Sequence, residues 1–480
     1  MINWREWSDQ VLETHPGAGK PILFSLVTAW SEECAAMDAS TFARPDVIEA
    51  VERLFTPVRA DADRRPDLNE RYNLGGWPST ALLTPDGYLL SGGTYLGPDQ
   101  IISLMNKVSD AWKTQAQDIR ARIQETETRV PPPLAAPVLV DASAVAWFRE
   151  RLLELFDRRH GGFGTAPKSP HATAMQFVLA LAGENADEAM REVADLSLGG
   201  IERLWDPAHG GFYRYADAED WTLPATEKTL DDNAGVLSVL LDGAVRVRSD
   251  ACRERAADLI RWVRHSLADE TGGGFYSSHA AISRAVDRTM YVDRNAEMIA
   301  AFLRAAQIFE DPWLRDFAIR SFERVIVPGY APGDGVAHEL AEHPVRGLLG
   351  DQVRAASAAI WAHAVTGQLP YSMLAAELMG YAIRKMWDER SGLFRDRVVP
   401  QMPLMPFALN CDAACMLDRL ATMTGDDAYR ERALGILGAL APEYQRHGVF
   451  AAPYALAIRE VVERHSPLAL LQVDWHLDND

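Results

Sequence analysis

The chain has 480 residues, of which 48% are hydrophobic, and 68 acidic side chains outnumber 48 basic ones to give a net charge of −20. This length allows two or three domains with sizeable cores, and the lack of basic runs argues against a nucleic-acid partner. No apolar run reaches the roughly 18 residues that span a bilayer, the N-terminus lacks a signal-peptide pattern, and four cysteines are too few for a disulfide framework. We therefore expect a cytoplasmic protein without membrane contact.

The first 112 residues alternate between short apolar runs and helix-length segments, which predicts a small α/β domain. The segment 84–87 reads Thr-Pro-Asp-Gly, a turn composition that favours a hairpin between the strands on either side. Strands are predicted at 21–29, 57–61, 80–83 and 88–92, and helices at 31–37, 46–55 and 99–112.

Two features of this domain are typical of a thioredoxin-like site. Pro78 follows Trp77 directly before a predicted strand, where a thioredoxin fold carries its cis-proline beside a docking groove. Ser31 and Cys34 stand at a helix start in the spacing of a redox Cys-x2-Cys, with Ser31 in place of the first cysteine. Because one thiol cannot form the internal disulfide of dithiol exchange, we expect Ser31, Cys34 and Pro78 to mark a degenerate site. The docking groove beside Pro78 also leaves binding of a protein partner as an open alternative.

A polar helical stretch at 113–128 leads into Val-Pro-Pro-Pro at 130–133, and consecutive prolines form a stiff spacer. We therefore place a linker at 113–140, between the α/β domain at 1–112 and a second domain at 141–466. The last residues, 467–480, form an acidic tail.

One pattern, Asp-x3-Gly-Gly-Phe, recurs through the second domain. It stands at 157–163, 206–212 and 269–275, returns as a variant at 388–394, and has weaker echoes near Gly335 and Gly448. The copies are about 50 to 60 residues apart, and such a period indicates a repeat architecture. Each copy lies between two helix-length stretches, so the repeat unit is a helical hairpin, and six hairpins predict an all-α (α/α)6 barrel.

The helices of this barrel fall into two classes. The segment 295–309 is apolar nearly all round, as expected of an inner helix, whereas 313–327 carries charges on one side only, as expected of an outer helix. Outer helices are predicted at 142–157, 187–204, 250–267, 313–327, 371–387 and 427–444, and inner helices at 172–182, 232–247, 294–309, 351–365, 410–423 and 453–464.

Polar residues gather where the predicted inner helices begin, after the Gly-Gly-Phe loops, and the repeat brings them to one rim. Short polar side chains at helix starts are also ordinary caps. Convergent carboxylates and amides at a concave site suit hydroxyl-rich ligands. The candidate acid–base residues are Glu227, Asp232, Asp351 and His338, and the candidate ligand-binding residues are Asn233, Asn295, Asp412, Tyr213, Trp221 and Tyr291.

The remaining patterns exclude several kinds of site. No His or Cys spacing matches a structural zinc site, and there is no phosphate-binding loop or nucleophile elbow. We therefore predict no metal and no cofactor. Cys411 and Cys415, four residues apart on an inner helix, are expected to lie in the core.

Several motifs together resemble the thioredoxin-like family that includes spermatogenesis-associated protein 20. They are Cys34-x2-Met37, Asp61-x-Asp63-x-Arg65-Pro66-Asp67, Gly75-Gly76-Trp77-Pro78, Gly162-Phe163-Gly164-x-Ala166-Pro167-Lys168 and Glu227-Lys228-x-Leu230-x-Asp232-Asn233. The resemblance implies a thioredoxin-like domain followed by a barrel similar to sugar epimerases and six-hairpin glycosidases. The family's Cys-His-x-Cys-His motif is reduced here to Ser31 and Cys34.

Three hypotheses stay open from the sequence. The barrel binds or transforms a carbohydrate-type small molecule at its mouth, in the manner of an epimerase or a glycoside hydrolase; the chain is a non-catalytic scaffold with both sites degenerate; or Cys34 serves a thiol-dependent redox function. The sequence does not decide whether the barrel is an enzyme.

Overall fold

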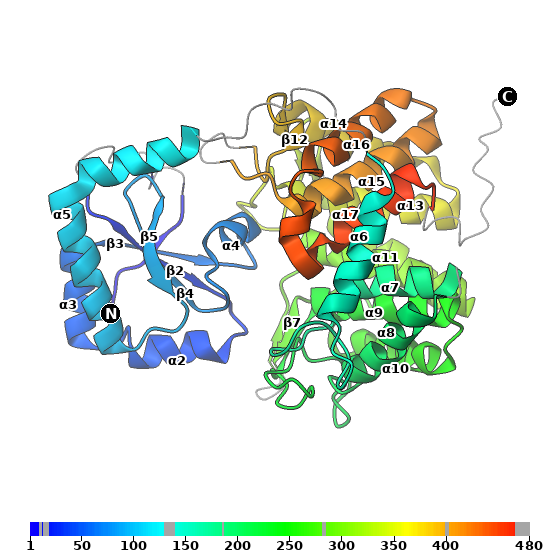
Figure 1. Ribbon diagram of the computed structural model, residues 1–480, viewed down its shortest axis with the longest axis horizontal. Coiled ribbons are helices and arrows are strands. Elements are labelled where there is room, and N and C mark those ends of the chain that lie inside the picture. Colours follow the sequence, from blue (N-terminus) through cyan, green and yellow to red (C-terminus); the bar gives the residue numbers. More distant parts are fainter. Residues whose placement is uncertain are drawn as a thin grey trace. The chain divides into compact units, whose positions relative to one another are not determined.

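The computed structural model describes residues 1–8, 12, 19–128, 140–184, 187–280, 285–398 and 403–465. The chain divides into two compact units, Met1–Pro133 and Leu134–Asp480 (Figure 1). Much of the predicted linker, from residue 129 to 139, and the predicted acidic tail lie outside the described residues. No helix within the described ranges is both long and apolar enough to cross a bilayer.

The first unit is an α/β domain built on a five-stranded mixed sheet of order β1-β3-β2-β4-β5. The first three strands in this order run parallel, and β4 and β5 are antiparallel to their neighbours. The strands are β1 (Arg5–Glu6), β2 (Ile22–Val27), β3 (Thr56–Asp61), β4 (Ser79–Leu83) and β5 (Leu89–Gly93). The helices are α2 (Glu32–Ser40), α3 (Pro45–Leu54), α4 (Pro66–Tyr72) and α5 (Pro98–Thr128).

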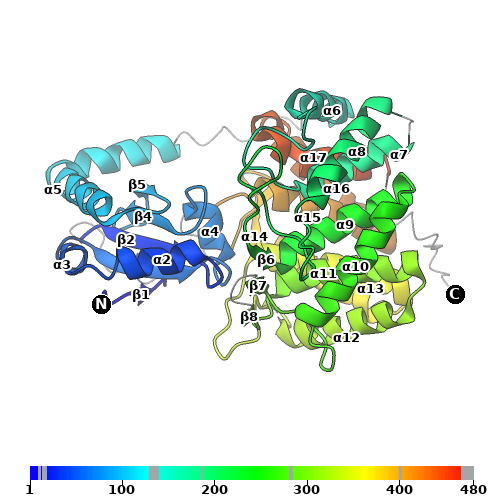
Figure 2. The same cartoon turned by 90° about the horizontal axis from the view of Figure 1, so that it is seen from below.

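Helices cover both faces of this sheet (Figure 2). Alternate residues of β2 point to opposite faces, so Leu23 joins a cluster with side chains of α3 and α5, and Phe24 joins a second cluster with Leu68 and Tyr72 of α4. α5 runs beyond its predicted end and includes the polar stretch that follows, with a non-helical backbone at Gln115.

The second unit is the predicted (α/α)6 barrel, with its twelve helices all within the described residues. The outer helices are α6 (Ser143–Leu155), α8 (Glu188–Glu202), α10 (Asp250–Ser266), α12 (Pro312–Gly329), α14 (Leu369–Met386) and α16 (Asp427–Leu440). The inner helices are α7 (Ala172–Glu184), α9 (Leu230–Arg246), α11 (Val292–Phe309), α13 (Leu349–Thr366), α15 (Phe407–Thr424) and α17 (Ala452–Ala457), which continues as a π-helical turn, Ile458–Val462. Each lies close to its predicted span.

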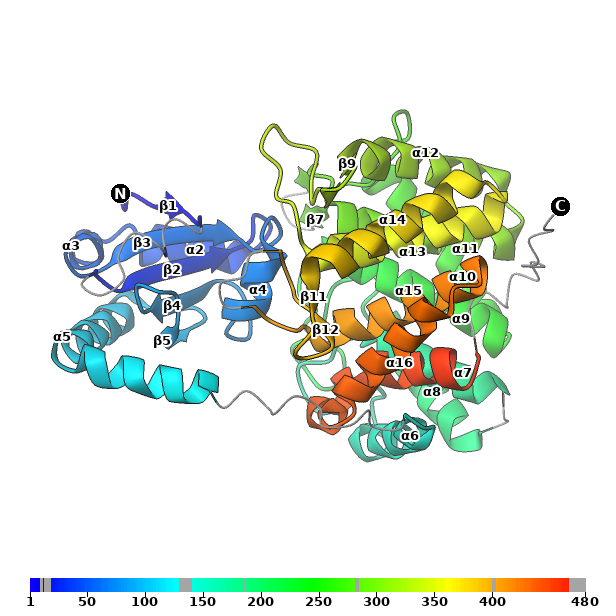
Figure 3. The same ribbon diagram turned by 90° about the horizontal axis from the view of Figure 1, so that it is seen from above.

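The inner helices form a closed ring. α7, α9, α11, α13, α15 and α17 pack on one another in this order, and α17 packs back on α7. Each inner helix also packs on an outer helix, as Figure 3 shows for α13 with α14 and α15 with α16. The turns from inner to outer helices end in N-caps: the side chains of Asp187, Ser249, Asp311 and Asp426 each accept a backbone N–H of the helix that follows.

Short strands lie in the connections from outer to inner helices, at the end of the barrel where the inner helices begin. They are β6 (Glu227–Thr229), β7 (Ser278–Ala280), β8 (Val286–Asp287), β9 (Tyr330–Ala331), β10 (Gly335–Val336), β11 (Trp387–Asp388) and β12 (Leu393–Phe394). β6, β7 and β8 form one antiparallel sheet that joins two successive repeats.

The recurrent Asp-x3-Gly-Gly-Phe segment is a tight loop held by a cationic side chain. Asp206 accepts the backbone N–H groups of Ala208 and His209 with one oxygen, and its other oxygen accepts the ammonium of Lys228 at 2.7 Å. Lys228 also donates to the carbonyl of Gly210 at 2.6 Å. In the neighbouring repeats, Lys168 and Arg324 bind Asp157 and Asp269 in the same way.

The second glycine of this loop is required by its conformation and by close packing. Gly211 has φ of +79°, and a Cβ atom there would lie 2.5 Å from the indole of Trp262. Only glycine adopts such a conformation at little cost, so the repeated sequence encodes a structural loop.

Candidate functional site

A carboxamide near the start of four inner helices anchors the loop that precedes the helix. Asn295 accepts the backbone N–H of Phe275 at 2.7 Å and donates to the carbonyl oxygens of Phe275 and Tyr291 at 3.0 and 2.9 Å. Equivalent bonds join Asn233 to Phe212, Gln352 to Val336 and Asn410 to Phe394. All four side chains are fully buried.

These hydrogen bonds give Asn233 and Asn295, which were predicted to bind a ligand, a structural role. Neither side chain lines the cavity described next. The four anchors, however, provide a common reference position on α9, α11, α13 and α15. The residue two positions after each anchor does line the cavity.

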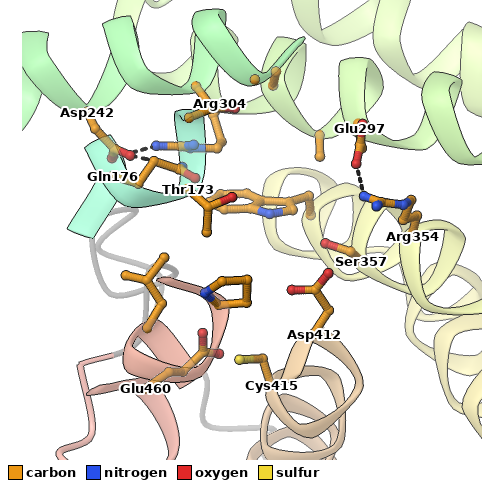
Figure 4. Close-up of a pocket in the computed structure, with 18 of the residues that line it drawn as sticks. Thr173, Gln176, Asp242, Glu297, Arg304, Arg354, Ser357, Asp412, Cys415 and Glu460 are labelled. Atoms are coloured by element: carbon orange, nitrogen blue, oxygen red, sulfur yellow. Dashed lines mark hydrogen bonds and ion pairs between the residues drawn. The ribbon is translucent and has the colours of Figure 1, made fainter. Parts of the chain in front are cut away.

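A cavity of about 600 Å³ lies inside the ring of inner helices (Figure 4). Its lining residues recur every three or four positions on each helix, which is the spacing of one helix face. By this spacing they form three layers along the barrel. The mouth layer is Thr173, Gly235, Glu297, Arg354, Asp412 and Pro453; the middle layer is Gln176, Ser238, Ala300, Ser357, Cys415 and Leu456; the floor layer is Ala180, Asp242, Arg304, Trp361, Arg419 and Glu460.

Ion pairs link the charged side chains of the floor layer. Asp242 accepts Arg304 at 2.8 Å and Gln176 at 3.1 Å, and Arg419 donates two hydrogen bonds to Glu460, at 2.6 and 2.9 Å. The bidentate pair of Arg419 and Glu460 fixes both side chains in one geometry. The charged groups of the floor therefore neutralise one another.

The mouth layer contains one ion pair and one carboxylate that is not used in a hydrogen bond. Glu297 pairs with Arg354, whereas the side chain of Asp412 has no hydrogen bond to any part of the chain that the structure describes. Burial raises the pKa of Asp412, and Glu460 adds to this effect, while Arg354 and Arg419 oppose it. Figure 4 shows Asp412, Ser357 and Cys415 around the same space.

The middle layer creates the space, because Ser238, Ala300, Ser357 and Cys415 are small. Cys411 lies in the core as predicted, but Cys415 borders the cavity. Burial raises the pKa of both thiols well above the ordinary value, so Cys415 is a neutral thiol rather than a nucleophilic thiolate.

A second cluster of polar side chains lies around the start of α9. Asp232 accepts Arg214 at 2.9 Å and the hydroxyl of Thr229, its helix N-cap, at 2.6 Å. Burial and the neighbouring Asp231 raise the pKa of Asp232. Asp231 itself lines the cavity, and its Oδ1 lies 3.8 Å from Nε of Arg294. Glu227, a predicted acid–base residue, is buried in β6 and does not line the cavity.

A third group lies at the starts of α11 and α13. His338 Nδ1 is 2.8 Å from Oδ1 of Asp351 and 3.9 Å from Oδ1 of Asp293, and the ring of His338 stacks on Tyr291 with centroids 5.0 Å apart. Burial raises the pKa of Asp351 to about 6, with a further contribution from Asp293 and opposition from His338. The structure thus brings together the predicted residues His338, Asp351 and Tyr291, but outside the cavity lining.

The other two predicted aromatic residues belong to the loop cores. Trp221 is 1% exposed and donates from its indole to the carbonyl of His160 at 3.0 Å. Tyr213 lies under the ammonium of Lys228, 4.9 Å from the ring centroid, and burial, together with a hydrogen bond to Asp206, raises the pKa of Tyr213 to about 12. Neither ring lines the cavity.

In the α/β domain, Cys34 is buried behind the start of α2. Ser31 is the N-cap and accepts the backbone N–H of Cys34 at 3.2 Å. Burial raises the pKa of the Cys34 thiol, and a hydrogen bond with Ser31 has a smaller, opposite effect on this pKa. The peptide between Trp77 and Pro78 is cis, and the ring of Trp77 packs edge-on against Trp30, with centroids 5.4 Å apart.

Because Cys34 is buried, largely protonated at neutral pH and without a second cysteine in the motif, we expect no dithiol exchange. Insulin reduction with dithiothreitol should proceed at the background rate with the intact chain and with Cys34→Ala alike. Turnover above background that is lost in Cys34→Ala would contradict this expectation. Ser31→Cys should place a second thiol beside Cys34. After reduction this pair should bind two equivalents of a thiol reagent, and after oxidation to a disulfide it should bind none.

Sequence comparison identifies the first domain. Residues 1–130 match the family model Thioredox_DsbH, described as a protein of unknown function, DUF255. This match is confined to the first unit, which is therefore similar to that thioredoxin-like family. The DUF255 model does not include the barrel, and longer relatives match a larger share of the chain.

These relatives are of animal origin. The chain is 26% identical over 344 residues to mouse spermatogenesis-associated protein 20, covering 65% of this chain and 42% of the relative. It is 25% identical over 308 residues to the uncharacterized protein B0495.5 of Caenorhabditis elegans, covering 59% and 42%. The matches therefore span about two fifths of the length of these relatives.

Solved structures with a similar barrel are sugar-processing enzymes. Cellobiose 2-epimerase of Spirochaeta thermophila superposes with a TM-score of 0.59 at 16% identity, covering 69% of this chain and 97% of the epimerase. A GH76 α-mannanase of Bacteroides thetaiotaomicron gives 0.54 at 10% identity, covering 68% and 97%. At these identities the likeness establishes the six-hairpin fold alone.

Proposed function

We propose that the barrel binds a small, hydroxyl-rich ligand of the carbohydrate type in its axial cavity. The observation that carries the proposal is Asp412, a carboxylate that faces the cavity and makes no hydrogen bond within the described chain. Even partial burial of a carboxylate without hydrogen-bond donors is costly, and ligand hydroxyl groups would supply those donors for the half-buried Asp412.

The rest of the lining supports a neutral polar ligand. The middle layer offers the hydroxyls of Ser238 and Ser357 and the carboxamide of Gln176. The guanidinium groups of Arg304, Arg354 and Arg419 are already paired with carboxylates, so they are poorly suited to bind an anion. The volume of about 600 Å³ lies within the usual range for small-molecule sites.

Asp412 is also the group best suited to move a proton. The pKa of Asp412 is raised, so its carboxyl titrates closer to neutral pH. An acid–base residue requires such a shift. Sugar isomerisation, epimerisation and glycoside hydrolysis all need such a group beside the reacting hydroxyl or glycosidic oxygen, so we assign Asp412 this role. The thiol-dependent alternative gains no support, because Cys34 is buried.

The test is a thermal-shift screen of the full chain against neutral mono- and disaccharides. A ligand at about 100 times its Kd stabilises a protein by about 2.7 kcal/mol, which raises the melting temperature of a domain this size by about 4 °C. Ser357→Leu, which fills the middle layer, and Asp412→Asn should both lose the shift. Asp195→Asn, at an exposed position on α8, should keep it.

Two results would contradict the proposal. The first is a screen in which no neutral saccharide changes the melting temperature of the parent chain. The second is a saccharide shift that survives in Ser357→Leu, because the ligand would then bind elsewhere. The first of these outcomes favours the non-catalytic scaffold.

A further inference from the structure

The side chains of Asp293, His338 and Asp351 form a compact group apart from the axial cavity. Each offers one ligand atom, and these three atoms all lie within 4.8 Å of one another. They come from three separate places in the fold: the first turn of α11, the loop before α13 and the first turn of α13. His338 and Asp351 are each 1% exposed.

This group holds more negative charge than its surroundings balance. Within the described residues, the only ion-pair partner of either carboxylate is His338; no Lys or Arg side chain pairs with Asp293 or Asp351. Oδ2 of Asp351 is fully buried and makes no hydrogen bond of acceptable geometry, although the backbone N–H of Asp293 faces the carboxyl. Buried carboxylates are normally paired, hydrogen-bonded or bound to a metal.

We propose that Asp293, His338 and Asp351 bind one divalent first-row transition ion, such as Zn²⁺. One imidazole nitrogen and two carboxylates are donors that such ions accept, whereas Mg²⁺ and Ca²⁺ prefer oxygen alone. The unsatisfied Oδ2 of Asp351 lies in the same carboxyl and provides a further donor. Three protein ligands leave one coordination position open.

The separations agree with this assignment. Two ligands that are each about 2.1 Å from a tetrahedral ion lie about 3.4 Å apart. The distances from His338 Nδ1 to the two carboxylates, 2.8 and 3.9 Å, bracket that value. Tyr291 stacks on the imidazole and fixes the plane of the ring, so the histidine is oriented before an ion binds.

The experiment is a titration of the full chain, stripped of metal with a chelator, with Co²⁺ and then Zn²⁺. We expect one Co²⁺ per chain with visible d–d absorption bands, displacement of these bands by Zn²⁺, and a rise in the melting temperature with Zn²⁺. His338→Gln and Asp351→Asn should lose the bands and lower the affinity for Zn²⁺ at least 100-fold. Asp316→Asn, at an exposed position on α12, should behave as the parent chain.

The parent chain decides the outcome even where a variant fails to fold. Absence of a saturable Co²⁺ spectrum in the metal-stripped parent chain overturns the proposal and leaves a hydrogen-bonded Asp–His–Asp network. The proposal also fails where a full spectrum persists in His338→Gln, because the ion then binds elsewhere. Saccharide binding in the axial cavity is measured separately, and neither result determines the other.

Discussion

Lys228→Met is expected to lower the free energy of unfolding of the barrel by about 3–5 kcal/mol. Lys228 is fully buried, and its ammonium contacts Asp206 at 2.7 Å and the carbonyl of Gly210 at 2.6 Å. Methionine keeps the volume but leaves Asp206 as a buried carboxylate without its cation. Urea denaturation followed by circular dichroism measures the loss, and Lys385→Met on the exposed side of α14 is the matched control, with an expected change below about 0.5 kcal/mol.

The dependence of the free energy of unfolding on pH should also change at acidic pH in Lys228→Met. Although burial opposes it, hydrogen bonds from Lys228 and from backbone N–H groups hold the pKa of Asp206 well below its ordinary value. A carboxylate with a depressed folded pKa stabilises the fold above its unfolded pKa, about 4, and loses this contribution as the pH falls. Lys228→Met should therefore weaken the dependence of stability on pH below about pH 4. A parent-like dependence on acidic pH would show that Asp206 does not depend on Lys228.

Asn295→Asp is expected to cost about 3 kcal/mol or more, although the side chains have the same shape. The Asn295 amide donates to the carbonyl oxygens of Phe275 and Tyr291, and a carboxylate would instead direct negative charge at both. Each buried polar group left unsatisfied costs about 1–3 kcal/mol, and charged groups cost more. Chemical denaturation measures the change, and Gln307→Glu at an exposed position of the same helix is the control.

This substitution separates the two interpretations of the rim residues. A ligand-binding Asn295 would tolerate aspartate with little loss of stability, because the carboxylate would face the ligand space. Retention of parent stability in Asn295→Asp would therefore contradict the role of loop anchor.

The sequence predicted the architecture because its signals were local and repeated. The recurrent loop marks each outer-to-inner connection, and the contrast between apolar and one-sided helices distinguishes inner from outer. The same repeat led to the prediction of Asn233 and Asn295 as ligand residues, whereas in the structure both side chains hydrogen-bond to the preceding loop. A polar residue at a helix start has the same appearance whether it faces a cavity or the preceding loop, and only the direction of the side chain separates the two.

The axial cavity was mostly missed, apart from Asp412. Glu297 and Arg304 lie seven residues apart on α11, and Asp412 and Arg419 have the same spacing on α15. These charged residues share one face of an inner helix that is not exposed to solvent. Such a pattern could have indicated a polar cavity inside the ring. Their pairing between helices far apart in the sequence required the closed ring, which no local pattern encodes.

The anchor and the mouth layer occupy positions two residues apart on four inner helices: Asn233 and Gly235, Asn295 and Glu297, Gln352 and Arg354, and Asn410 and Asp412. The first member of each pair is an amide in every case, while the second ranges from glycine to arginine. If the cavity binds the proposed ligand, stability and recognition are encoded by different residues of the same helical turn. A new ligand preference can evolve, or be engineered, through exchanges at the second position while the hairpins keep the contacts that close the ring.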